Sequence, residues 1–220
     1  MAADRVCSAV DLDADPAVVD WLAPFLDERE RGHADARQGV ARMRYVVAHG
    51  ALRVLLAERL GTEPAAIQYR YSCAVCGSRE HGRPEVAAAG AGVSFSLSHS
   101  GDIGVVAIAP ESVGVDVEVV RARRHGERVA ERIMSADDYA RWRSLPAAER
   151  PRAFLREWTA KEAYLKLLGV GITRALRDVH AAPVRTWDDW PSGCVTSICV
   201  ASEEALAGFT RAVFAAQGDG

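Results

Sequence analysis

The side chains best suited to chemistry lie close together, at Lys161, Glu162 and Lys166. Glu162 and Lys166 are four positions apart, so on a helix a carboxylate and an ammonium lie side by side and can reach the same point. The alternative for this pair is an exposed ion pair on a solvated face, which contributes about 0.2–1 kcal/mol. Lys161 falls within an apolar stripe. A buried ammonium without a partner is costly, so we expect it to have an acidic or phosphate partner.

The lysine content of the chain singles out the same place. Of the 27 lysine and arginine residues, only Lys161 and Lys166 are lysine. Arginine is a rigid fork that stays charged, whereas lysine is a compact point charge that can also exchange a proton. Chance is one explanation for the two lysines, and a requirement for a compact ammonium is the other.

The segment 152–169 is predicted to be a helix that positions these side chains. Apolar residues recur on one side of it at helical spacing: Phe154, Trp158, Leu165 and Leu168. Gly169 is a typical helix stop. The stripe faces a core, and Glu162 and Lys166 lie on its flank.

Two more carboxylates lie on a predicted strand at 112–120. Its valines alternate toward one face, so Gly114, Asp116 and Glu118 share the other. Residues two apart on a strand are separated by about 6.6–6.8 Å, close enough for both carboxylates to bind one cation. Carboxylates on the exposed face of an edge strand are a common alternative, but Gly114 would let a ligand approach closely.

If the strand packs against the helix, Asp116, Glu118 and Glu162 converge, with the two lysines behind them. Three carboxylates are hard oxygen ligands, which suit Mg²⁺ better than zinc or iron. Mg²⁺ with lysines nearby fits a phosphate-bearing substrate. The arrangement therefore indicates phosphoryl-type transfer, in which electrostatics and positioning supply most of the catalysis.

The remaining pattern of the 220 residues indicates an α+β fold. A long helix is predicted at 36–60, a hairpin of two strands at 93–98 and 103–109, and two further strands at 194–200 and 210–215. Both halves show a helix followed by strands, so we expect two similar halves.

Other candidate binding residues are weaker. The arginines of the helix at 36–60, Arg42, Arg44 and Arg53 among them, are mostly expected on a solvated face, although bidentate arginine suits phosphate. His99 lies at a strand end beside two serine hydroxyls, where a structural role and a ligand contact are both open. Cys73 and Cys76 form one C-x-x-C pair with His81 nearby. One pair favours reduced structural thiols over zinc, which needs four ligands.

Composition excludes several classes of protein. No window approaches the run of about 20 apolar residues that a membrane span requires, and the N-terminus lacks a signal-peptide pattern, so we expect a cytoplasmic protein. Five cysteines without a secretion signal argue against a disulfide framework. A formal charge of −3 excludes a strongly basic nucleic-acid binder.

Four ordered motifs resemble the signature of the 4'-phosphopantetheinyl transferases of the large, single-chain class. They are Gly82-Arg83-Pro84, Phe95 to Ser100, Gly114-Val115-Asp116-Val117-Glu118, and Trp158 to Ala163 with Lys166. The resemblance implies two pseudo-symmetric halves, here 1–108 and 109–220, each a small, mainly antiparallel sheet packed on a long helix. It also implies a monomer, because one chain contains both halves of the site.

The resemblance further implies that coenzyme A binds between the halves and that Mg²⁺ bridges its pyrophosphate to Asp116, Glu118 and Glu162. The serine of an acyl or peptidyl carrier protein would attack the β-phosphorus and release adenosine 3',5'-bisphosphate. Glu162, directly or through a metal-bound water, would take the serine proton, and Lys166 would stabilise the leaving phosphate.

The same resemblance assigns contacts with coenzyme A. Arg83, Ser98 and His99 would hold its nucleotide end, and Lys161 would be anchored by an acid or phosphate at the metal site. Relatives often carry an arginine where this chain has His49, so the 3'-phosphate clamp would fall to Arg42, Arg44 or Arg53. The arginine run from Arg121 to Arg132 is a candidate docking surface for an acidic carrier. The rival functions are a non-catalytic coenzyme A or nucleotide-binding module and a Mg²⁺-dependent phosphohydrolase.

Overall fold

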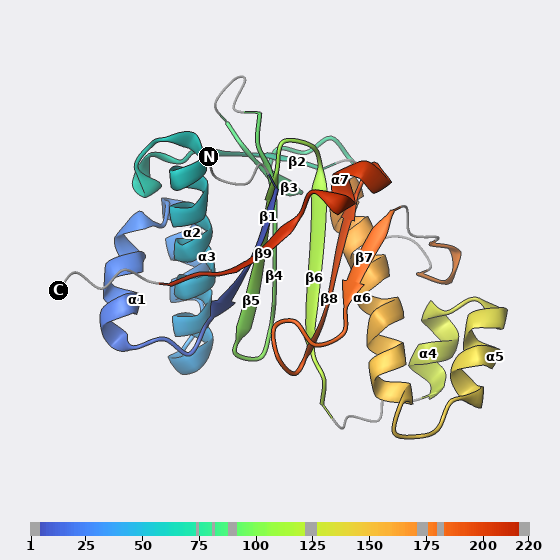
Figure 1. Cartoon of the computed structure of the whole chain (residues 1–220). Coiled ribbons are helices and arrows are strands. Elements are labelled where there is room, and N and C mark those ends of the chain that lie inside the picture. Colours follow the sequence, from blue (N-terminus) through green and yellow to red (C-terminus); the bar gives the residue numbers. More distant parts are fainter. Residues whose placement is uncertain are drawn as a thin grey trace.

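The computed structural model describes residues 5–73, 75–80, 82–87, 92–121, 127–170, 176–179 and 183–215. Two sheets stand side by side in the centre, with helices on their outer sides (Figure 1). None of the helices in these ranges has the length and apolar character that a bilayer span requires. The mixed α+β class predicted from the sequence is confirmed.

The first sheet has the strand order β4-β5-β1-β9. Its strands are β1 (Val6–Asp11), β4 (Ser94–Ser100), β5 (Ile103–Ala109) and β9 (Thr210–Val213). The predicted hairpin is β4 and β5, which pair antiparallel, and β5 pairs antiparallel with β1. The C-terminal strand β9 then adds to β1 in parallel. The predicted boundary after residue 108 is therefore wrong for the last strand, which returns to the sheet of the N-terminal half.

Three helices cover the first sheet on one side: α1 (Pro16–Leu22), α2 (Glu28–Asp35) and α3 (Gly39–Leu60) (Figure 1). The long helix α3 confirms the prediction for 36–60 and ends at Gly61, which adopts a left-handed conformation with φ 63°. Asp27 and Glu30 form a capping box at the start of α2. A small hairpin of β2 (Tyr69–Ser72) and β3 (Arg83–Val86) follows α3.

The second sheet has the order β6-β8-β7, with all neighbours antiparallel. Its strands are β6 (Val113–Val119), β7 (Val184–Trp187) and β8 (Cys194–Val200). The long helix α6 (Arg150–Leu168) packs on β6 and β8, and it ends at Gly169 with φ 68°, as predicted. Two helices, α4 (Glu127–Ile133) and α5 (Ala136–Ser144), lie on the far side of α6, and α7 (Glu203–Ala207) precedes β9 (Figure 1).

Serine side chains join the two sheets where β4 meets β6. The hydroxyls of alternate β4 residues accept hydrogen bonds from backbone N–H groups of β6, in the pairs Ser96 with Val115 (3.0 Å), Ser98 with Val117 (3.4 Å) and Ser100 with Val119 (3.2 Å). The register advances in the same direction on both strands, so they run parallel. The polar face of β4 is thus used to hold the halves together, directly beside the carboxylates of β6.

Candidate active site

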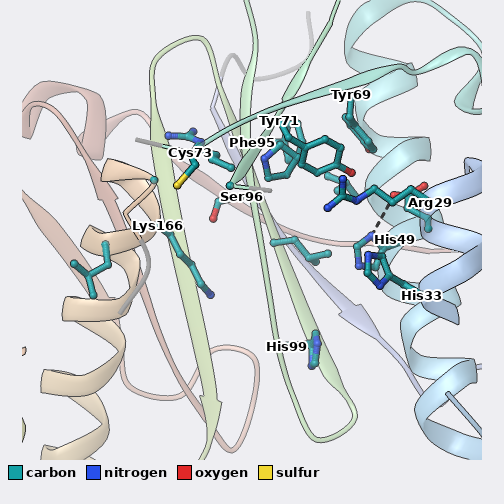
Figure 2. Close-up of a pocket in the computed structure, with 18 of the residues that line it drawn as sticks. Arg29, His33, His49, Tyr69, Tyr71, Cys73, Phe95, Ser96, His99 and Lys166 are labelled. Carbon is teal, nitrogen blue, oxygen red and sulfur yellow. Dashed lines mark hydrogen bonds and ion pairs between the residues drawn. The ribbon is translucent and has the colours of Figure 1, made fainter. Parts of the chain in front are cut away.

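A cleft of about 920 Å³ separates the two halves. Figure 2 shows its two walls: Lys166 comes from α6 on one side, and Arg29, His33 and His49 come from the helices of the N-terminal half on the other. The strands β2 and β4 contribute Tyr69, Tyr71 and Phe95. A cleft of this size between two lobes can accept a ligand as large as a nucleotide cofactor.

Asp116 lies beneath the α6 wall and is 6% exposed. Its Oδ1 accepts hydrogen bonds from Lys166 Nζ (2.7 Å) and Ser98 Oγ (2.8 Å), while its Oδ2 is buried without a partner among the described residues. Lys166 Nζ also donates to Val115 O (3.0 Å). Burial raises the pKa of Asp116, and the charge of Lys166 opposes this effect without cancelling it.

Glu118 and Glu162 lie near Asp116. Ser100 Oγ donates to Glu118 Oε2 (2.6 Å), and Glu162 lines the cleft with its Oε1 buried and unpartnered among the described residues. Burial raises the pKa of Glu162, and the charges of Asp116 and Glu118 raise it further. Burial and Asp116 likewise raise the pKa of Glu118, despite the bond from Ser100. The charge of Asp116 thus acts on both Glu118 and Glu162, so the three carboxylates lie close enough to interact.

These oxygen atoms fit a divalent cation. Buried polar atoms in proteins are almost always satisfied, so Asp116 Oδ2 and Glu162 Oε1 need a partner that the described part of the chain does not supply. Carboxylate oxygens are the donors that Mg²⁺ prefers. Within the described ranges, no three His, Cys, Asp or Glu side chains are already arranged to hold a metal ion, so binding would require these carboxylates to move closer together.

Gly114 serves helix packing rather than ligand approach, which corrects the sequence-based interpretation. A Cβ atom at this position would lie 1.9 Å from Ala163 O and 2.5 Å from Leu167 N. The backbone of α6 thus occupies the space that the missing side chain leaves. This close approach holds Glu162 and Lys166 over the strand that carries Asp116.

Lys161 is buried, as the apolar stripe predicts, but it lies on the side of α6 that faces α4, away from the cleft. Its Nζ donates to Ile133 O (2.5 Å) at the end of α4 and lies 3.9 Å from Glu157 Oε2. The acidic partner expected for it is therefore Glu157, and Lys161 is absent from the described lining of the cleft. Its predicted anchoring at the metal site is wrong. The next residue, Glu162, faces the cleft, and consecutive residues on a helix point about 100° apart, so Lys161 is directed elsewhere.

The three arginines predicted as phosphate clamps have other partners. Arg53 is fully buried and bonds Glu30 (2.6 Å), Asp27 (2.8 Å) and the carbonyl oxygen of Ile67 (2.9 Å). Arg44 forms a two-pronged ion pair with Asp13 (2.6 and 2.8 Å), and Arg42 lies 3.5 Å from Asp35. None of these three arginines is among the described residues that line the cleft, so this prediction is corrected.

The other residues predicted to contact coenzyme A, which are His99, Ser98 and Arg83, differ in their positions. His99 lines the cleft, and burial together with the charges of His49 and Lys166 lowers its pKa. Ser98 is not among the described residues that line the cleft; its hydroxyl donates to Asp116 and accepts from Val117 N. Arg83 also lines the cleft, but its guanidinium ties the halves together by donating to Leu167 O (2.9 Å) and Val113 O (3.2 Å).

The sequence-based interpretation missed the basic wall of the cleft. Its basic residues come from α2, the loop after it and α3: Arg29, His33, Arg37 and His49. Tyr45 lies among them, with its ring stacked on His49 (centroids 4.1 Å apart) and under Arg37 (4.4 Å). The signal was present in the charged run from Asp27 to Arg31, but the start of α2 had to be known before a face could be assigned.

Two further sequence features fall partly outside the described residues. Of the predicted docking run, Arg121, Arg128 and Arg132 are exposed, whereas Arg123 and Arg124 lie outside the described ranges. Cys73 and Cys76 line the cleft as free thiols, and His81 lies outside the described ranges.

Comparison with known proteins gives a consistent set of relatives. A family model described as the 4'-phosphopantetheinyl transferase superfamily matches residues 112–206, which include Asp116, Glu118, Glu162 and Lys166. The chain is similar to the 4'-phosphopantetheinyl transferase HetI of Nostoc sp., at 31% identity over 176 residues that cover 73% of this chain and 71% of HetI.

Two shorter matches agree with this result. The chain is 34% identical over 137 residues to the 4'-phosphopantetheinyl transferase AcpT of Salmonella typhimurium, covering 62% of this chain and 64% of AcpT. It is 40% identical over 87 residues to the 4'-phosphopantetheinyl transferase psf-1 of Bacillus pumilus, covering 40% and 36%.

Proposed function

Because the chain belongs to the 4'-phosphopantetheinyl transferase superfamily, we propose that it transfers the phosphopantetheine arm of coenzyme A to a serine of an acyl or peptidyl carrier protein. The other product is adenosine 3',5'-bisphosphate. One observation carries the assignment of the site: two buried carboxylate oxygens, Asp116 Oδ2 and Glu162 Oε1, have no partner among the described residues, and Lys166, which bonds the other oxygen of Asp116, lines the same large cleft as Glu162.

Asp116, Glu118 and Glu162 would hold Mg²⁺. The support is the effect of the Asp116 charge on the pKa of Glu118 and of Glu162, the two carboxylate oxygens that have no partner among the described residues, and the preference of Mg²⁺ for carboxylates. When bound, Mg²⁺ would neutralise part of the pyrophosphate charge. Ser98 and Ser100 orient the strand carboxylates through their hydroxyls, which lie at 2.8 and 2.6 Å. Such supporting hydrogen bonds keep metal ligands in place.

Glu162 and Lys166 would act on the two ends of the displacement. Both line the cleft and lie one turn apart on α6. Glu162 would accept the proton of the carrier serine as that oxygen attacks the β-phosphorus. The Lys166 ammonium, fixed by Asp116 and Val115 O, would stabilise the negative charge that develops on the departing phosphate.

The nucleotide end of coenzyme A would lie against the basic wall. Arg29, His33, Arg37 and His49 gather there, and they replace Arg42, Arg44 and Arg53 as the candidates for the 3'-phosphate. His99 lies between this wall and Lys166. Because its pKa is lowered, its ring is neutral and would donate a hydrogen bond toward a phosphate. Both walls belong to one chain, and on that ground we expect a monomer.

The carrier protein would dock beside the α6 wall. Carrier proteins are acidic around their serine, and Arg121, Arg128 and Arg132 offer exposed positive charge at the end of β6 and along α4. Opposite charges on two surfaces mainly accelerate association and select the partner.

The test uses the full chain with coenzyme A, Mg²⁺ and an apo acyl carrier protein, after which the carrier is weighed by mass spectrometry. We expect the carrier to gain one phosphopantetheine. An unmodified carrier together with free adenosine bisphosphate would instead indicate hydrolysis, and no change in either would indicate a binding module. A parallel reaction with Asp116→Asn tests whether the carboxylate site is responsible.

A further inference from the structure

Two thiols lie on the cleft wall outside the carboxylate site. Cys73 and Cys76 follow β2 in the connection to β3, and both line the cleft that Lys166 and His99 also line. Cys73 is half-buried and Cys76 is exposed, so small molecules that enter the cleft can reach them. Figure 2 shows the sulfur of Cys73 above the side chain of Lys166. The roles given above to the cleft residues do not use either thiol.

The backbone around these cysteines is a tight turn. Gly77 N donates to Cys73 O (2.8 Å) and Cys73 N donates to Ser78 O (3.0 Å), with Gly77 in a left-handed conformation at φ 72°. These backbone bonds hold Cys73 and Cys76 in one turn, where hydrogen bonding to the Cys73 sulfur from the backbone of Cys76 and Val75 and from the Cys76 side chain acts on its ionisation. These donors stabilise the thiolate and lower the pKa of Cys73.

The other three cysteines provide a contrast within the same chain. Cys7, Cys194 and Cys199 are buried in strands β1 and β8. Burial raises the pKa of Cys194 to about 11 and that of Cys199 to about 12, and it raises the pKa of Cys7 still further. A buried thiol that stays protonated is a poor nucleophile. Only the pair in the cleft therefore combines access, a partner thiol and a stabilised thiolate among the chain's five cysteines.

We propose that Cys73 and Cys76 form a redox-active dithiol that closes to a disulfide on reaction with a low-molecular-weight disulfide such as oxidised glutathione. The Cys73 thiolate attacks one glutathione sulfur, and the second glutathione leaves as its thiolate. Cys76 loses its proton and attacks the Cys73 sulfur, which releases the first glutathione. The protein loses two protons and two electrons, and oxidised glutathione takes them up to become two molecules of the reduced form.

Closure of the disulfide would reshape the rim of the cleft. Two bonded sulfur atoms lie about 2.05 Å apart, closer than two hydrogen-bonded thiols, so the turn must tighten. The base of the same connection is tightly packed, since a Cβ on Gly82 would lie 2.2 Å from Ser72 O and 2.5 Å from Cys73 N. The next residue, Arg83, ties the two halves together. We expect the oxidised protein to bind cleft ligands with a different affinity from the reduced protein.

The first experiment needs no cleft ligand. The fully reduced chain is exposed to oxidised glutathione, remaining thiols are alkylated, and peptides are identified by mass spectrometry. We expect a disulfide between Cys73 and Cys76, reversible by a reducing agent, with the three buried cysteines still alkylatable after unfolding. Before oxidation, Cys73 should be alkylated at least roughly tenfold faster than the buried cysteines in the folded chain.

Matched variants sharpen the result. In Cys76→Ser, Cys73 lacks a resolving thiol, so the mixed disulfide with glutathione should persist. In Cys73→Ser, reaction with glutathione should slow at least roughly tenfold. Equal alkylation of all five thiols, or a persistent mixed disulfide in the unaltered chain, would overturn the proposal. So would a purified chain that holds zinc through these thiols, with alkylation blocked until a chelator is added.

The second experiment compares binding of coenzyme A to the reduced and oxidised chains by calorimetry, and this part rests on the proposed function. A change in Kd of at least roughly threefold, absent in Cys73→Ser, supports the effect on the cleft. An equal Kd for both forms would overturn that effect. If neither form binds coenzyme A while the disulfide still forms, the cleft assignment fails and the redox pair stands.

Discussion

Two clusters of buried charge, one in each half of the molecule, differ in how completely their polar atoms are satisfied. In the N-terminal half, Arg53 of α3 is fully buried and bonds two carboxylates and two carbonyl oxygens. In the C-terminal half, Asp116 and Glu162 each keep a buried oxygen without a partner among the described residues. Both clusters place charge against a long helix. We call the Arg53 cluster closed, because its hydrogen bonds are made within the protein, and the Asp116 and Glu162 cluster open, because each of these side chains keeps an oxygen without a partner among the described residues.

The difference separates structure from function. A buried charge whose hydrogen bonds are complete has no capacity left for a ligand, so its effect is on folding. A buried carboxylate with an unpartnered oxygen is unfavourable in the free protein, and such groups are typical of sites that bind a cation or substrate. The sequence contains both kinds of residue on similar helices, and the contacts distinguish them.

Arg53→Met tests the closed cluster and should have the largest effect. It leaves Glu30 buried without its main cationic partner, and removal of one member of a buried pair costs about 3–5 kcal/mol. Urea unfolding monitored by circular dichroism measures this loss. The control is Arg44→Met on the same helix, whose ion pair with Asp13 is exposed and screened by solvent, so its loss should be far smaller. Similar losses for the two variants would contradict the comparison.

Glu162→Gln tests the open cluster. It keeps the size of the side chain but removes one proposed metal ligand and proton acceptor, so transfer to the carrier should fall by about 10²–10³-fold. Stability should change little. The measurement is the initial rate of carrier modification at saturating coenzyme A.

Glu157→Gln is the matched control for Glu162→Gln. Glu157 lies on the same helix, and burial raises its pKa as it does that of Glu162, but it faces Lys161 rather than the cleft. We expect transfer to stay within about threefold of the original rate, an effect of less than 1 kcal/mol. If Glu157→Gln reduces transfer as strongly as Glu162→Gln, position relative to the cleft is not what makes Glu162 functional.

Gly114→Ala should disturb both stability and transfer, because the added Cβ would lie 1.9 Å from Ala163 O and force α6 away from β6. Overpacking of this kind costs about 1–3 kcal/mol. The displaced helix carries Glu162 and Lys166 with it, so the carrier-modification rate should fall as well. Gly32→Ala on α2 is the control, since its Cβ would meet nothing within 4 Å. A tolerated Gly114→Ala would contradict the close packing of helix and strand.

The local pattern predicts the elements of the open cluster well. The apolar stripe and Gly169 define α6, and strict alternation with valine defines β6. The pairing of strands that are far apart in the sequence was not predictable in the same way. The strand β1 is a short, nearly continuous apolar run whose pattern does not identify a partner, and β9 returns from the end of the chain to pair with it. The partners of Arg53 include Glu30, which is 23 positions away, so its spacing could not distinguish a phosphate clamp from a structural ion pair. The basic wall was missed for the same reason.

Acidification should weaken the closed cluster, with the smallest of these effects. Burial alone would raise the pKa of Glu30, but the hydrogen bond from His49 and the charge of Arg53 outweigh it, so the pKa is lowered. A carboxyl whose pKa is lower in the folded state stabilises the fold above its unfolded pKa, about 4.3, and this contribution is lost as pH falls through the folded pKa. Urea unfolding between pH 6 and pH 3 should show this loss for the original chain and for Glu28→Gln, an exposed position on the same helix. Glu30→Gln should lose that part of the pH dependence, and an unchanged pH profile would show that Arg53 is held by its other partners instead.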